Sequence, residues 1–202
     1  MTEKTLERRA AMATLLADRP NNLFVVPGLG STTWDAAAAA GGNDDRDFYL
    51  WGAMGGAAMI GLGLALAQPK ARVAVITGDG EMLMGLGSLA TIGVQKPGNL
   101  AIVVFDNGLY GETGMQESHT SGGVDLLAVA RGCGIGRVMD VVDEAGLKEL
   151  AGLLARHNGT LFARVRILPD DPPRVLPEKD GVVIKDRVRR AAAGGGGNRL
   201  PD

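Results

Sequence analysis

The chain has 202 residues, of which 46% are hydrophobic and 22% charged, proportions that predict one globular domain with a sizeable core. Its 21 basic and 23 acidic side chains leave a net charge of −2, which argues against a duplex nucleic-acid binder, because such proteins carry a surplus of Lys and Arg. With Cys133 as the single cysteine, an intrachain disulfide, a thiolate zinc site and an iron–sulfur cluster are excluded.

The sequence predicts neither a targeting segment nor a membrane span. Residues 1–19 mix acids and bases and lack an apolar core followed by a cleavage site. The longest apolar stretch, residues 53–67, is interrupted by four glycines and is too short for a bilayer, which needs roughly 20 apolar residues. We therefore expect a cytoplasmic protein that binds neither a membrane nor a nucleic acid.

The first third of the chain predicts a helix, a buried strand and two more helices. The helix is expected over residues 2–18, where most of one apolar stripe is formed by Leu6, Ala10, Met12, Ala13 and Leu16. Residues 23–26 form a continuous apolar run of the kind found in buried parallel strands. Helices are expected at 33–40 and 54–67, separated by a polar loop and a short extended segment.

The remainder alternates regularly between strand and helix. Strands are predicted at residues 73–76, 100–105, 138–141 and 161–167. The helices between them are predicted at residues 85–94, 124–132 and 144–157. This alternation indicates an α/β fold, a doubly wound parallel sheet with helices on both faces.

The composition changes after the last predicted strand. Residues 169–177 are rich in proline and predict an extended segment, and residues 182–193 predict a basic helix. Residues 194–202 begin with four glycines and predict a disordered tail. We therefore expect residues 1–168 to form the folded domain, followed by 169–193 as an extended segment with a helix.

Glycines gather where three predicted strands end. The chain has 31 glycines, about twice the ordinary share of roughly 7%, and several lie in residues 28–32, in Gly78-Asp79-Gly80 and in Asn107-Gly108. The carboxyl ends of parallel strands form the usual ligand-binding edge, where exposed amides favour anions. A carboxylate, an amide oxygen and backbone carbonyls suit a Mg²⁺ ion that also holds phosphate oxygens. The sequence predicts such a site with Asp79 and Asn107.

The combination of these motifs resembles a known enzyme family. Gly78-Asp79-Gly80, followed by Asn107, resembles the diphosphate- and magnesium-binding motif of thiamine diphosphate enzymes. Residues 51–55, Trp-Gly-Ala-Met-Gly, resemble the preceding segment of the 2-oxo acid decarboxylase branch, and residues 106–116 are most similar to the sulfopyruvate decarboxylase beta-subunit and phosphonopyruvate decarboxylase subgroup. The resemblance covers roughly residues 24–135.

The resemblance implies a role for each matching residue. Mg²⁺ would be held by Asp79, Asn107 and the carbonyl of Leu109. The cofactor's diphosphate would meet the segment from Gly78 to Glu81 and the first strand exit, with contacts assigned to Gly30, Ser31, Gly78, Gly80 and Glu81.

The organic part of the cofactor and the substrate would meet other residues. The carbonyl of Gly52 would accept a hydrogen bond from the cofactor's 4′-amino group, and Met54 would bend the cofactor into its V shape. Tyr110 and Gln116 are candidates to line the substrate pocket. His119 is a candidate for substrate anion binding or proton transfer, with a plain surface histidine as the alternative.

Two residues depart from the family pattern. Glu81 stands where a small residue is usual, and since its carboxylate would repel a diphosphate, we expect it to point away. Thr113 stands where pyruvate decarboxylases carry an acidic proton-transfer residue, which disfavours simple pyruvate decarboxylation by that route.

The family needs a glutamate from a pyrimidine-binding domain to form the reactive carbanion. The single helix and strand before Gly28 are too short for that domain. We therefore expect a partner subunit to supply the glutamate in a hetero-oligomer that decarboxylates a small 2-oxo acid resembling sulfopyruvate or phosphonopyruvate. An acetolactate synthase-like carboligase subunit is one alternative. A non-catalytic module that binds a nucleotide or phosphate is another.

Overall fold

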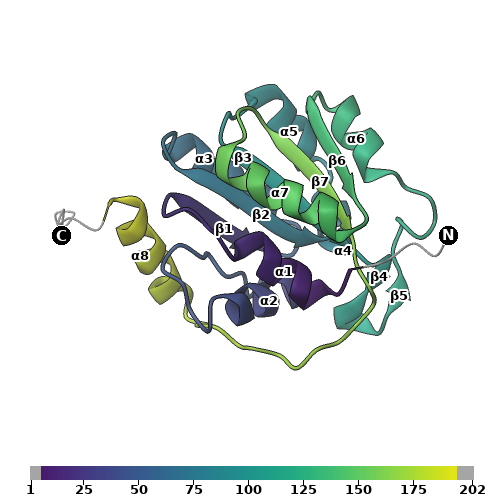
Figure 1. Ribbon diagram of the computed structural model, residues 1–202, viewed down its shortest axis with the longest axis horizontal. Helices are drawn as coiled ribbons and strands as arrows, with labels where there is room; N and C mark the ends of the chain where they lie inside the picture. The colour runs from purple at the N-terminus through teal and green to yellow at the C-terminus, as the bar shows by residue number, and fades with distance from the viewer. Residues whose placement is uncertain (1–5, 195–202) are drawn as a thin grey trace.

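The computed structural model describes residues 6–194, and its centre is a parallel sheet of five strands (Figure 1). The strands, in sheet order, are β1 (Leu23–Pro27), β2 (Arg72–Gly78), β3 (Leu100–Asp106), β7 (Leu161–Arg166) and β6 (Arg137–Val141). Each strand predicted from a continuous apolar run is present within two residues of its expected bounds. Because the strands are parallel, their carboxyl ends all lie at one edge of the sheet.

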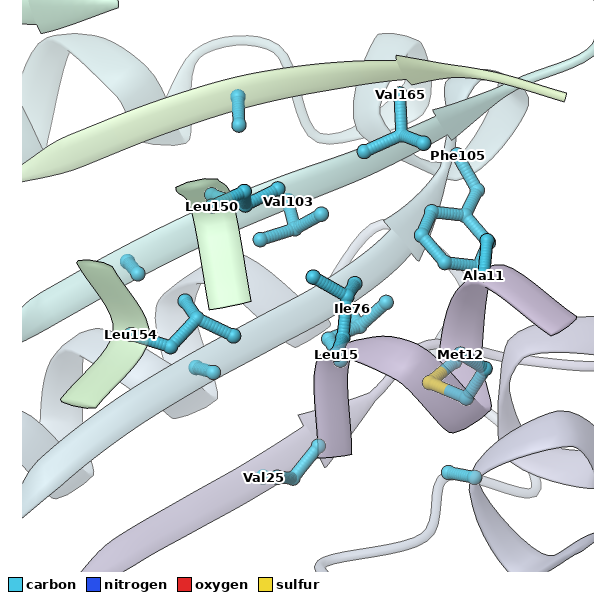
Figure 2. Packing of buried hydrophobic residues seen from close by; sticks show 14 of the residues in the cluster. Ala11, Met12, Leu15, Val25, Ile76, Val103, Phe105, Leu150, Leu154 and Val165 are labelled. Atoms are coloured by element: carbon cyan, nitrogen blue, oxygen red, sulfur yellow. The ribbon is translucent and has the colours of Figure 1, made fainter. Parts of the chain in front are cut away.

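Helices cover both faces of this sheet, which confirms the predicted doubly wound fold. One face is covered by α1 (Arg8–Leu16), α2 (Ser31–Ala39) and α7 (Glu144–Arg156). The other is covered by α3 (Ala57–Ala67), α5 (Ser88–Gln95) and α6 (Leu126–Gly132). Successive strand residues alternate between the two cores, as expected from the pleat: Ala74 and Ile76 enter the first core, and Val73 and Val75 enter the second. Figure 2 shows the first core, including Met12, Leu15, Ile76, Val103, Leu150 and Leu154.

The predicted apolar stripe of the first helix is confirmed only in part: Met12 is buried, and Leu6 and Leu16 pack against the first core. The buried residues of α1 are Arg8, Ala11, Met12 and Leu15, whereas Ala10 and Ala13 are exposed. Arg8 is buried because its guanidinium pairs with the fully buried Asp35 of α2. Because of this ion pair, a charged residue occupies the buried face of the helix. A search for apolar residues in the sequence does not reveal such a position. The first residues of the predicted helix, 2–5, lie outside the described part of the chain.

Three other regions differ from prediction. The predicted helix at 85–94 is α5, but a separate short helix, α4 (Asp79–Met84), begins directly at the motif aspartate and ends at Gly85. The predicted helix at 54–67 begins only at Ala57, so Met54 lies in the preceding turn. After β3 the chain forms a small hairpin, which was not predicted, from β4 (Leu109–Tyr110), the 3₁₀-helix η1 (Gly111–Thr113) and β5 (Gln116–Glu117).

The C-terminal segment returns to the body of the protein. Residues 168–180 are extended, as predicted, and lead past α2 to α8 (Gly181–Ala192) (Figure 1). In α8, Ile184 and Val188 are buried, and Ile184 joins the first core. Of the predicted tail, residues 195–202 lie outside the described residues. Within residues 6–194, no helix has the length and apolar character that crossing a bilayer requires.

Candidate active site

A cavity of about 200 Å³ lies at the carboxyl ends of β1, β2 and β3. The sequence motifs predicted to act together meet here, because parallel strands bring their carboxyl ends to one edge. The predicted residues that line the cavity are Ser31, Met54, Gly78, Asp79, Gly80, Glu81, Asn107, Leu109 and Tyr110.

Asp79 is the buried carboxylate at the end of β2. Asp79 is only 2% exposed. Its Oδ2 atom accepts hydrogen bonds from the hydroxyls of Ser118 and Thr120, the latter at 3.2 Å. Burial raises the pKa of Asp79, and the Ser118 hydrogen bond opposes that rise. Both hydroxyls address the same oxygen, so they fix the orientation of the carboxylate.

The end of β3 places the neutral oxygens of Asn107 and Leu109, the other predicted metal ligands, at the cavity. The β2–β3 register pairs Gly78 with Phe105, so the residues that follow each strand are neighbours. Asn107 Oδ1 accepts a hydrogen bond from the Leu109 amide at 2.9 Å, which closes a tight turn in the backbone. Thr120 links the two strand ends, because its hydroxyl oxygen also lies 2.8 Å from Asp106 Oδ1.

These donors fit a hard divalent cation that shares its coordination with a bound anion. One carboxylate and an amide oxygen suit Mg²⁺, which commonly keeps phosphate oxygens and water as further ligands. Among residues 6–194, no group of three or more His, Cys, Asp or Glu side chains is placed to hold a metal ion.

The end of β1 leads into the N-terminus of α2, whose backbone amides are suited to bind an anion. Gly30 is the N-cap of α2 and has a φ of +78°, a conformation that favours glycine. No side chain caps the first turn of α2, so the amides that begin at Ser31 remain available. A Cβ at Gly30 would lie 2.5 Å from Glu112 Oε1, which leaves no room for a larger residue.

The Glu81 carboxylate is directed at protein donors. It accepts hydrogen bonds from the Leu29 amide at 2.9 Å, the Thr77 hydroxyl at 2.8 Å and the Gly55 amide at 3.2 Å. This arrangement agrees with the expectation that the carboxylate does not face a diphosphate.

Met54 is presented by a sharp turn. Ala53 before it has a φ of +56°, which is uncommon outside glycine. Met54 is 37% exposed and lines the cavity, whereas the neighbouring Gly52 is exposed and is not a lining residue. This turn therefore has one side in the cavity and the other open to solvent.

Three further candidate residues are not among those that line the cavity. Gly30 is the N-cap of α2, directly before the lining residue Ser31. Gln116 forms a pair of 2.8 Å hydrogen bonds with Thr113, which does line the cavity. His119 Nδ1 lies 3.2 Å from the Tyr110 hydroxyl, so it contacts the cavity wall through that ring.

The prediction missed several residues of the site. Ser118 and Thr120 lie in a polar loop that gave no sign of contact with Asp79. Arg8, Trp34 and Arg174 also line the cavity, and the Arg174 guanidinium lies 4.3 Å from the Trp34 ring centroid. Arg174 comes from the extended segment after β7, which is distant in sequence from every motif.

The comparisons with known proteins identify the family of this chain. Residues 28–163 match the family described as "Thiamine pyrophosphate enzyme, C-terminal TPP binding domain". The chain is 46% identical over 177 residues to a phosphonopyruvate decarboxylase of Streptomyces viridochromogenes, a similarity that covers 84% of this chain and 43% of the relative. It is 49% identical over 105 residues to sulfopyruvate decarboxylase subunit beta of Methanocaldococcus jannaschii, covering 52% of this chain and 53% of that one.

A solved structure supports the fold. Benzoylformate decarboxylase from Polynucleobacter necessarius has a TM-score of 0.68 at 21% identity, over 83% of this chain and 34% of that one. The chain spans about half the length of these relatives or less. The family match favours thiamine diphosphate (thiamine pyrophosphate, TPP) over the alternative of a nucleotide-binding module. The chain belongs to the thiamine pyrophosphate enzyme family, and its residues 28–163 correspond to the C-terminal TPP-binding domain of that family.

Proposed function

We propose that this chain is the diphosphate- and Mg²⁺-binding subunit of a thiamine diphosphate-dependent decarboxylase acting on a small 2-oxo acid. The observation that carries the proposal is the meeting of Asp79, Asn107 and the open N-terminus of α2 in one cavity. When bound, thiamine diphosphate supplies a carbanion that adds to the substrate carbonyl and a ring that accepts the electrons released by decarboxylation. Asp79, Asn107 and the Leu109 carbonyl would hold the metal ion.

The charge of the cavity supports a requirement for the cation. Five carboxylate residues line it, against two guanidinium groups, those of Arg8 and Arg174; the acidic residues are Asp79, Glu81, Glu112, Asp170 and Asp171. A diphosphate entering this surplus of negative charge is stabilised only when a divalent cation accompanies it. We therefore expect cofactor binding to depend strongly on Mg²⁺.

An exposed apolar surface supports the partner subunit. Helix α3 is apolar around its whole circumference, yet Met59 and Leu66 are 42% and 51% exposed. A helix of this kind is ordinarily buried. Met54 and Met84 are also exposed, and Met84 lies close to the backbone of Gly55. A pyrimidine-binding subunit seated here would cover these residues and complete the site at Met54.

Arg174 supports a substrate with a second anionic group. Arg8 is already paired with Asp35, but Arg174 is exposed and held only over the Trp34 ring among the described contacts. Its guanidinium is suited to a sulfonate or phosphonate. The relatives named as sulfopyruvate and phosphonopyruvate decarboxylases point to the same substrate class.

The test is reconstitution with a partner. The chain is purified alone and together with the product of the neighbouring gene, and CO₂ and aldehyde release from sulfopyruvate, phosphonopyruvate and pyruvate is measured with thiamine diphosphate and Mg²⁺. We expect decarboxylation only with both chains, and only weakly with pyruvate. Full activity of this chain alone would contradict the two-subunit proposal, and a product with a new carbon–carbon bond would identify a carboligase instead.

A further inference from the structure

We propose that Glu81 is a positioning residue. Its side chain holds two cofactor-facing segments, residues 28–31 and 53–55, at fixed positions relative to each other. The inference rests on the proposed function, because it concerns how the same cavity keeps its shape. Glu81 is 4% exposed, so its hydrogen bonds are shielded from water.

One carboxylate receives one backbone N–H from each segment. Oε2 of Glu81 accepts from the Leu29 amide at 2.9 Å, immediately before the Gly30 N-cap and Ser31. Oε1 accepts from the Gly55 amide at 3.2 Å, immediately after Met54. The segment assigned to the diphosphate and the one assigned to the cofactor's organic part are thus joined through a single side chain.

The carboxylate is itself anchored to the metal-binding segment. Its Oε2 also accepts from the Thr77 hydroxyl at 2.8 Å, at the end of β2 and two residues before Asp79. Hydrogen bonds from amides to a buried carboxylate are charge-assisted and roughly twice as strong as neutral ones. One carboxylate therefore connects, by hydrogen bonds, three segments that we assign to the cofactor site.

Gly28 makes room for this arrangement. A Cβ at position 28 would lie 1.9 Å from Glu81 Oε2 and 2.8 Å from Thr77 Oγ1. The backbone has little freedom to retreat, because the Gly28 amide donates to the Ile76 carbonyl at 2.8 Å. Gly28 and Glu81 are consequently a matched pair, in which the missing side chain of one provides the space for the other.

Amide exchange in the cofactor-free chain tests the positioning role directly. Glu81→Ala should make the Leu29 and Gly55 amides exchange at least about tenfold faster, since each loses its acceptor. Glu149→Ala, on the exposed side of α7, is the control and should leave both amides unchanged. If Glu81→Ala fails to fold, Glu81→Gln keeps one acceptor oxygen and should still release at least one of the two amides. Unchanged exchange of both would overturn the proposal.

A double-mutant cycle tests the consequence for the cofactor. Gly28→Ala should weaken binding of thiamine diphosphate with Mg²⁺ by at least about tenfold, and part of that loss should disappear in the Glu81→Ala background, where the 1.9 Å clash with Glu81 Oε2 is absent and only the 2.8 Å approach to Thr77 Oγ1 remains. Gly132→Ala is the control, because a Cβ there meets no atom within 4 Å. An equal loss in both backgrounds would overturn the positioning role, whereas a wild-type chain that binds no thiamine diphosphate would overturn the proposed function and leave the exchange result to decide the positioning role.

Discussion

Asp79 and Glu81 are buried carboxylates two residues apart on α4, and their surroundings hold them in opposite ways. Glu81 accepts hydrogen bonds from two backbone amides, those of Leu29 and Gly55. Asp79 is held through its Oδ2 atom by the side-chain hydroxyls of Ser118 and Thr120. This difference fits the two proposed roles, in which Asp79 binds the metal ion and Glu81 positions backbone segments.

The largest expected effect comes from removing the metal ligand. Asp79→Ala should weaken Mg²⁺-dependent binding of thiamine diphosphate by more than about 100-fold, since even outer-shell partners of metal ligands contribute roughly 10- to 100-fold. Calorimetric titration at several Mg²⁺ concentrations measures this. Retained affinity would show that the two carboxylates do not differ in the way described.

A smaller effect is expected from the hydroxyl that orients Asp79. Ser118→Ala removes one of two hydrogen bonds to Oδ2, so the apparent Mg²⁺ affinity in the same titration should fall roughly tenfold. Ser121→Ala is the matched control, because that hydroxyl donates to the Gly108 carbonyl at 2.7 Å instead. Equal effects of the two variants would argue against an orienting role for Ser118.

Arg174 also lines the cavity and differs from both carboxylates in carrying a positive charge. Arg174→Ala should raise KM for sulfopyruvate or phosphonopyruvate by several-fold, up to about tenfold, with a smaller change for pyruvate. Steady-state kinetics of the reconstituted enzyme measure both substrates. Arg190→Ala, exposed on α8, serves as the control, and an equal change for all substrates would argue against recognition of the second anionic group.

The smallest effect on the cofactor is expected from a third buried carboxylate, Asp47, which is absent from the cavity lining. Burial raises the pKa of Asp47 to about 6, although Arg19, 2.6 Å away, opposes the rise. The folded chain therefore keeps this proton at a pH where the unfolded chain has released it. The resulting stabilisation is fully present below about pH 4 and lost as the pH rises through 6, by on the order of 3 kcal/mol.

Asp47→Asn isolates this contribution. The difference in unfolding free energy between wild type and variant should change between pH 4 and 7, with the wild type losing stability relative to the variant as the pH rises. Thiamine diphosphate affinity should remain unchanged. Denaturant unfolding at each pH measures the difference, and a constant difference would refute the raised pKa.

The sequence was sufficient to predict the fold and the placement of its motifs. Short continuous apolar runs bounded by turn residues favour strands buried on both faces, and β1, β2 and β3 were predicted within two residues. Asp79 and Asn107 were expected together because both follow neighbouring parallel strands, and both line the cavity. Apolar runs and strand-end motifs are predictable because their physical cause, burial of the strand and the parallel strand order, can be read from neighbouring residues.

The contacts among distant segments were not predictable. Ser118, Arg174 and the donors to Glu81 reach the site through loops whose paths depend on tertiary packing. The buried stripe of α1 was predicted only in part for the same reason, since burial of Arg8 depends on Asp35 from another helix. Long-range hydrogen bonds and ion pairs leave no periodic signal in the sequence.

The central claim is that the strand-end cavity binds the diphosphate of thiamine diphosphate together with a divalent cation. Calorimetric titration of the wild-type chain with thiamine diphosphate, with and without Mg²⁺, and with ADP and Mg²⁺ as the comparison ligand, tests it most directly. The account predicts binding of thiamine diphosphate only when Mg²⁺ is present and much weaker binding of ADP. Metal-independent binding, or a preference for ADP, would contradict it.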